Sequence, residues 1–227
     1  MNILRSLKEI TIVFILQYLL VVLCGVIYLL FGYDINNFMG SIGYFIVVIF
    51  NIIVIILLNK RYKLITNKVS FSLYFPYIYL IICYALIMNN IFFIFNLTNS
   101  NVVSINIILL IISSGVIGPV VEELLFRGIL FNNLNKYYSN KKSILISSLI
   151  FGLFHTSING FIYAFFLGII LSYIYLKAND IKICMLGHML SNILVLFLSG
   201  FNLYILLLSI YGFILSGCLI YKLQKVN

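Results

Sequence analysis

The chain has 227 residues, a mean hydropathy of +1.20 and only 8% charged side chains. Soluble globular domains carry about 25% charged residues, so this composition excludes a soluble protein. The formal net charge is +9, but the basic residues lie in short segments between long apolar runs. That placement is typical of membrane topology and not of nucleic-acid binding, so we expect no nucleic-acid partner.

Long apolar runs recur from residue 10 to residue 221. They are too long and too continuous for the alternating strands of a membrane barrel, so they predict helices. We predict an all-α, polytopic transmembrane helical bundle that forms a single membrane domain over residues 1–227. About eight spans fit the chain, at 10–31, 39–58, 70–95, 102–131, 143–158, 160–176, 182–199 and 203–221.

Basic residues occupy every second connecting segment. They occur before the first span, in 60–68, in 136–142, in 177–182 and after the last span, whereas the connections between them have none. By the positive-inside rule, this alternation places both termini in the cytoplasm. Arg127 is the one basic residue outside the scheme.

The second half of the chain has ionisable and amide side chains within its predicted spans, while the first half has a few neutral polar residues such as Gln17 and Asn51. A charged side chain at the centre of a bilayer costs roughly 2.5–3.5 kcal/mol on insertion scales, and such residues are by default candidates for a functional site. The candidates are Glu122, Glu123, Arg127, His155, His188 and Asn192.

Helical geometry separates the two neighbouring glutamates. Glu123 and Arg127 are four residues apart, so they share a helix face and can form an ion pair. Glu122 lies about 100° around the helix and has no basic residue at the third or fourth position after it. We therefore expect Glu123 to be structural, and Glu122 to find a partner on another helix and to serve as a general base.

The stretch "GVIGP", residues 115–119, precedes this pair. Pro119 removes a backbone hydrogen bond and would kink the helix, which would open space beside Glu122. The alternative is that Gly115 and Gly118 form a face for close helix packing. The sequence leaves both interpretations open.

Four of the candidate residues are predicted to lie at similar depths in the membrane. From the predicted cytoplasmic ends of their spans, Glu122 lies roughly 13 Å deep, His155 roughly 18 Å, His188 roughly 9 Å and Asn192 roughly 15 Å. His188 and Asn192 are also four residues apart and share a face. We expect the four side chains to lie in one slab near the middle of the membrane.

These residue types suit a peptide hydrolase. A carboxylate beside an imidazole can hold and deprotonate a water molecule, and a second imidazole with an amide can stabilise an oxyanion. A divalent metal such as zinc, bound by Glu122, His155 and His188, is an alternative that the residues leave open. No serine or cysteine lies in an obvious nucleophilic partnership with them.

Three motifs in this order resemble those of the CAAX prenyl endopeptidase and bacteriocin-processing family of intramembrane proteases, also called the CPBP or Abi family. "EELLFR" (122–127) resembles its EExxxR motif, "FGLFH" (151–155) its FxxxH motif, and "HMLSN" (188–192) its third motif. The resemblance covers roughly residues 102–200, which we expect to be the catalytic core region.

The resemblance implies roles for these residues. Glu122 would activate the water and His155 would help to hold it, while His188 and Asn192 would form the oxyanion site. Glu123 and Arg127 would support them. The family is commonly labelled metalloprotease, but a carboxylate, two imidazoles and an amide do not make a closed zinc set, so we expect no metal cofactor.

The sequence thus predicts an intramembrane endopeptidase that acts from the cytoplasmic side on a membrane-associated peptide or protein. Its Ile-, Asn- and Lys-rich usage suggests a bacterium, with the enzyme in the plasma membrane and a role in peptide maturation or bacteriocin self-immunity. One alternative is a non-catalytic immunity or scaffold protein. Another is a proton-coupled transporter, although confinement of the polar cluster to the second half disfavours it.

Overall fold

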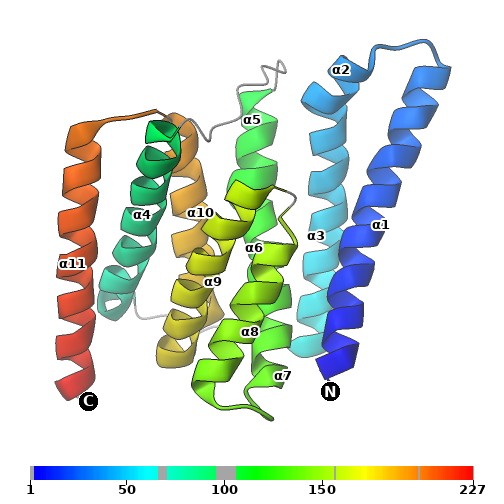
Figure 1. Cartoon of the computed structure of the whole chain (residues 1–227). Coiled ribbons are helices and arrows are strands. Elements are labelled where there is room, and N and C mark those ends of the chain that lie inside the picture. Colours follow the sequence, from blue (N-terminus) through cyan, green and yellow to red (C-terminus); the bar gives the residue numbers. More distant parts are fainter. Residues whose placement is uncertain (1–2, 66–70, 96–105, 156, 199, 227) are drawn as a thin grey trace.

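The computed structural model describes residues 3–65, 71–95, 106–155, 157–198 and 200–226. All regular secondary structure in these ranges is helical, which confirms the predicted all-α bundle (Figure 1). The predicted break at 96–101, the start of the span at 102 and Lys68 lie outside the described residues.

The described helices form eight rods in chain order, two of them composed of several shorter segments. The rods are α1 (Ile3–Leu30); α2 (Ile35–Asn37), η1 (Phe38–Ile42) and α3 (Gly43–Tyr62); α4 (Phe71–Ile94); α5 (Ile107–Leu110), η2 (Ile111–Ile117), α6 (Gly118–Glu123), η3 (Leu124–Phe131) and α7 (Asn132–Leu134); α8 (Asn140–Leu153); α9 (Ile158–Ala178); α10 (Ile181–Phe197); and α11 (Leu203–Val226). The η segments are π-helical.

Six of these rods are long and apolar enough to cross a membrane, so the chain is a multi-pass membrane protein. They are Ile3–Leu30, Ile35–Tyr62, Tyr74–Ile94, Ile107–Leu134, Ile158–Ala178 and Leu203–Leu223. The other two, α8 and α10, have 14 and 17 residues and are short for a full crossing. The count of eight spans therefore stays a prediction.

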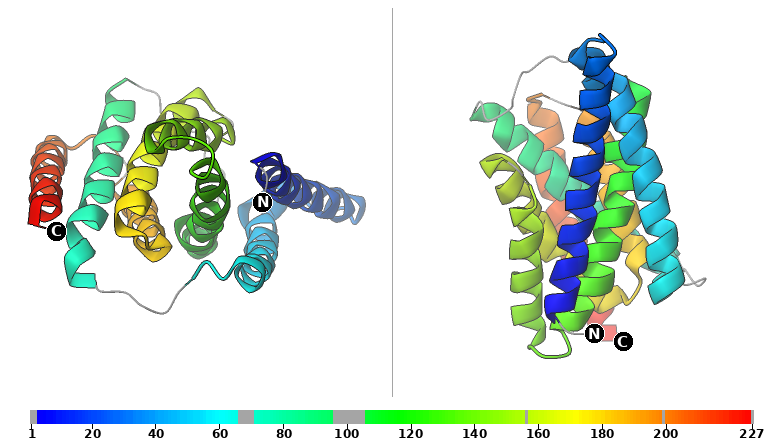
Figure 2. Two further views of the ribbon diagram at one scale, coloured as in Figure 1. Left: turned by 90° about the horizontal axis from the view of Figure 1, so that it is seen from below. Right: turned by 90° about the vertical axis from the view of Figure 1, so that its right-hand side faces the viewer.

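The rods form an elongated bundle with the fourth rod, α8, α9 and α10 in its middle (Figures 1 and 2). α1 and α3 pack together on one flank, and α4 with α11 on the other. The two chain ends, the α7–α8 turn and the end of α3 lie at the same end of the bundle (Figure 1). We call this the basic end, because it carries Arg5, Lys60, Lys136, Lys177 and Lys222; that it faces the cytoplasm stays a prediction from the positive-inside rule.

The fourth rod shows no sharp break at Pro119. Instead η2 widens the helix just before it, so that the amide of Gly118 donates to the carbonyl of Ser113, and Pro119 falls in the first turn of α6. Single π turns often occur at functional sites. Gly115 packs against α10, where an added Cβ would lie 2.9 Å from Ile193 Cγ1. The packing interpretation of "GVIGP" therefore fits Gly115, whereas the expected kink at Pro119 is absent and a π-helical segment precedes the proline instead.

α8 and α9 pack closely through small residues and are joined by a short turn. A Cβ on Gly168 would lie 3.0 Å from Ser148, and one on Gly152 would lie 3.1 Å from the carbonyl oxygen of Phe161. α8 ends at Leu153, so the span predicted to reach residue 158 is too long. His155 therefore lies beyond the end of α8. The next helix, α9, begins after Ser157, whose side chain caps it by accepting the amide of Gly160.

Candidate active site

A buried ion pair lies where the fourth rod meets α8, α9 and α10. Arg127 Nη1 donates to Glu123 Oε1 at 2.9 Å, and both side chains have no exposed surface. Arg127 Nη2 also donates to the carbonyl of Gly168 at 3.3 Å, and the guanidinium lies 4.4 Å from the centre of the Phe151 ring. The predicted pairing of Glu123 with Arg127 is confirmed.

His188 connects the two glutamates. Its Nδ1 donates to Glu123 Oε1 at 3.0 Å, since a carboxylate can only accept. Its Nε2 then faces Glu122, with Oε2 at 3.8 Å. The expected partner of Glu122 on another helix is therefore His188 on α10, whereas the bond from His188 to Glu123 was not predicted.

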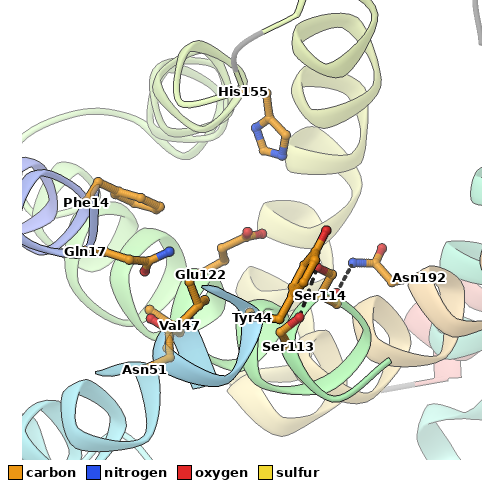
Figure 3. Close-up of a pocket in the computed structure, with 12 residues that line it drawn as sticks. Phe14, Gln17, Tyr44, Val47, Asn51, Ser113, Ser114, Glu122, His155 and Asn192 are labelled. Atoms are coloured by element: carbon orange, nitrogen blue, oxygen red, sulfur yellow. Dashed lines mark hydrogen bonds between the residues drawn. The ribbon is translucent and has the colours of Figure 1, made fainter. Parts of the chain in front are cut away.

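The two neighbouring glutamates occupy different environments. The Glu123 side chain is fully buried, whereas that of Glu122 is 25% exposed and lines a cavity of about 480 Å³ (Figure 3). His155 and Asn192 line the same cavity, while the neighbouring His188 is buried behind Glu122. The fold thus brings the other three predicted residues, His155, His188 and Asn192, close to Glu122.

The other polar groups at the cavity are held in defined orientations. His155 Nδ1 donates to the carbonyl of Phe151 at 3.1 Å, which leaves Nε2 as an acceptor; Figure 3 shows its ring directed into the cavity. Asn192 Nδ2 donates to the carbonyl of Ser114 at 3.0 Å. Since a side-chain amide has two hydrogens on nitrogen, the second one is available to a ligand.

Part of the cavity wall comes from residues that sequence reasoning did not assign to the site. α1 contributes Phe14 and Gln17, the second rod contributes Tyr44 and Asn51, and η2 contributes Ser113 and Ser114. A signal was present for two of them, because Gln17 and Asn51 are polar residues within otherwise apolar spans. Nothing in the sequence indicated that the first two rods would face Glu122.

The cavity lies on the side of Glu122 that faces away from the basic end. Ser113 and Ser114 precede Glu122 on a rod that runs toward the basic end, and Asn192 follows His188 on a helix that runs away from it. On the other side the rod is packed, with η3 residues Leu124–Phe131 at most 1% exposed. This core lies between Glu122 and the basic end, and the expected approach of a substrate from the cytoplasmic side stays a prediction.

We predict that a cysteine placed in this cavity reacts from the non-cytoplasmic side. With Cys24 and Cys218 changed to alanine, Gln17→Cys is expected to bind a membrane-impermeant maleimide in intact cells. The matched variant Lys60→Cys, at the basic end, is expected to react only after lysis. Labelling in the opposite pattern would place the cavity on the cytoplasmic side.

We predict that Arg127→Met destabilises the protein by roughly 3–5 kcal/mol, since it leaves a buried carboxylate without its cation. The measurement is the free energy of unfolding of the purified protein in a denaturing-detergent titration. The control is Arg61→Met, which removes an exposed contact to Glu9 and is expected to cost less than about 1 kcal/mol. Equal losses in the two variants would contradict the structural role of the buried pair.

Comparison with known proteins agrees with the three motifs. Residues 104–194 match the family model described as type II CAAX prenyl endopeptidase Rce1-like. A Bacillus subtilis (strain 168) protein, "Putative membrane peptidase YdiL", is 31% identical over 84 residues, which cover 37% of this chain and 34% of that protein. No solved structure matches the chain. These findings support the resemblance of residues 104–194 to the CAAX prenyl endopeptidases, and the chain spans about a third of the length of the curated relative that it matches.

Proposed function

We propose that the protein is an intramembrane endopeptidase that hydrolyses peptide bonds in membrane-associated peptides or proteins. The observation that carries this proposal is the contrast between the two glutamates. Glu123 is committed to a buried ion pair, whereas Glu122 faces an open cavity with His155 and Asn192. A partly exposed carboxylate beside an imidazole is the arrangement that a general base for water requires.

Glu122 and His155 would hold the attacking water. The carboxylate of Glu122 accepts one proton from it, and the Nε2 acceptor of His155 orients it through its second hydrogen. The hydroxide then attacks the carbonyl carbon of the substrate, and the carbonyl π electrons move onto oxygen to give a tetrahedral intermediate. Glu122 returns the proton to the amide nitrogen as the carbon–nitrogen bond breaks.

Asn192 and His188 would stabilise the negative charge on the carbonyl oxygen. The free Nδ2 hydrogen of Asn192 is held in place by the bond that its partner hydrogen makes to Ser114. His188 would donate from Nε2 in its doubly protonated form, in which both ring nitrogens are donors; its Nδ1 is bonded to Glu123 and its Nε2 lies 3.8 Å from Glu122 Oε2. Fixed donors aimed at a developing oxyanion provide a large part of the rate enhancement in such reactions.

We propose that this chemistry needs no metal ion. Among the described residues no group of three or more His, Cys, Asp or Glu side chains is placed to hold one. This finding supports the metal-free proposal over the alternative zinc set of Glu122, His155 and His188.

We further propose a place and a role for the enzyme. The residue usage suggests a bacterium, in which a multi-pass protein of this kind would lie in the plasma membrane. A cavity facing away from the basic end suits a substrate that reaches the site from the outer half of the bilayer. Maturation of a secreted peptide or self-immunity against a bacteriocin would each provide such a substrate.

We predict that Glu122→Gln lowers the cleavage rate by about 10²–10⁴-fold, the usual contribution of a general base. The matched control is Asp34→Asn, which removes a carboxylate that caps α2. Membrane peptidomics of cells with wild type and each variant is expected to show an uncut precursor only with Glu122→Gln. Unchanged processing in that variant would refute the mechanism and favour a non-catalytic immunity or scaffold protein.

We predict that chelation does not affect the activity. Purified protein dialysed against EDTA is expected to retain its cleavage rate, because Glu122 and His155 activate water without an ion. Added zinc is expected to give no stimulation. A rate that falls on dialysis and returns with zinc would instead support a metal bound by Glu122, His155 and His188.

A further inference from the structure

A second, smaller cavity of about 220 Å³ adjoins the first and shares Phe14, Glu122 and His155 with it. The remaining walls of this cavity are four aromatic rings, contributed by Phe14, Phe126, Phe151 and Phe154. We call it the phenylalanine pocket. The larger cavity has amide and hydroxyl groups on its walls, so the two spaces beside Glu122 differ in chemistry.

The rings of the phenylalanine pocket pack against one another from three parts of the chain. The ring centres of Phe14 and Phe154 are 4.8 Å apart, those of Phe126 and Phe154 are 5.6 Å apart, and those of Phe126 and Phe151 are 4.9 Å apart. Arg127 also contacts the face of Phe151. The pocket is therefore preformed and anchored to the buried ion pair.

The walls of the pocket divide into fixed and adjustable parts. Phe126 and Phe151 are at most 1% exposed and belong to the core, so they form a fixed floor. Phe14 comes from α1, a helix on the flank of the bundle whose outer half is largely exposed. Phe14 is thus the wall that can be altered without disturbing the centre of the bundle.

Size and chemistry together define the occupant. Pockets that enclose drug-sized ligands measure about 300–1,000 Å³, so 220 Å³ is suited to one amino-acid side chain and is small for a lipid chain. Aromatic walls favour an apolar group, and an anionic side chain would lose its hydration and face the carboxylate of Glu122. The occupant also lies directly beside Glu122 and His155, where the reacting carbonyl must be.

We propose that the phenylalanine pocket binds the side chain of the residue next to the scissile bond and selects a large apolar one, such as leucine, methionine or phenylalanine. This proposal rests on the proposed function and specifies its substrate class. The substrate backbone would lie in the larger cavity, where Gln17, Asn51 and Ser114 offer hydrogen bonds. Specificity then comes from an apolar pocket and is independent of the residues that activate water.

The test uses a library of peptides prepared by digesting a bacterial proteome, incubated with the full-length protein in detergent. Mass spectrometry identifies the cut sites, and only sites absent with Glu122→Gln are counted. Wild type is expected to show large apolar residues on one side of the cut. A difference of one methylene in an apolar pocket changes kcat/KM by about 10–200-fold, so alanine is expected to be cut at least about tenfold more slowly.

Two variants at neighbouring positions of α1 sharpen the test. Phe14→Trp narrows the pocket and is expected to shift the preference toward alanine and valine. Ile15→Trp, the same bulk on a side chain that is 51% exposed, is expected to leave the preference unchanged. Phe154→Ala widens the pocket from the opposite wall and is expected to favour larger residues. Thermal unfolding of each purified variant confirms that it is folded.

The outcomes separate this proposal from the proposed function. Glu122-dependent cleavage without apolar enrichment, or with the same preference in wild type, Phe14→Trp and Phe154→Ala, would overturn the pocket and leave the endopeptidase intact. Absence of any Glu122-dependent cleavage of the library would overturn both. Apolar enrichment that shifts with Phe14→Trp and not with Ile15→Trp would establish the pocket.

Discussion

The buried contact between Glu123 and Arg127 organises the centre of this protein. Removing two charges from water costs several kcal/mol per ion, and only good geometry with further hydrogen bonds offsets that cost. Here the guanidinium also bonds the backbone of α9 at Gly168 and covers the ring of Phe151 on α8, while the carboxylate accepts a bond from His188 on α10. One ion pair therefore fixes how the fourth rod and three other helices meet.

The function of Glu122 depends on this arrangement. Glu123 holds Arg127 and His188 in the core, whereas Glu122 lies about 100° around the helix and points into the cavity (Figure 3). Asn192 reaches the same cavity from α10, and His155 reaches it from just beyond the end of α8 at Leu153. A core of fully buried η3 residues closes the basic end, so the open side of the site faces the other half of the membrane.

Much of this could be predicted from local patterns. Apolar runs separated by polar breaks gave helix positions close to those of the described rods, because length and hydropathy dominate membrane helices. The roles of Glu122 and Glu123 followed from helical spacing. The sequence could not predict the end of α8 before His155, which depends on the cap at Ser157 and on packing against α9. It also could not assign Phe14 or Tyr44 to the site, since an aromatic residue on an apolar helix looks the same whether it faces lipid or a cavity.

The central claim is that the two adjacent glutamates have different roles: Glu122 activates water, and Glu123 stabilises the fold. The most direct measurement determines the unfolding free energy and the rate of peptide cleavage side by side for Glu122→Gln and Glu123→Gln. The account predicts that Glu122→Gln keeps wild-type stability and loses cleavage, whereas Glu123→Gln loses stability because Arg127 is left buried without its anion. If Glu123→Gln were as stable as wild type, or if Glu122→Gln still cleaved at the wild-type rate, the division of roles would be wrong.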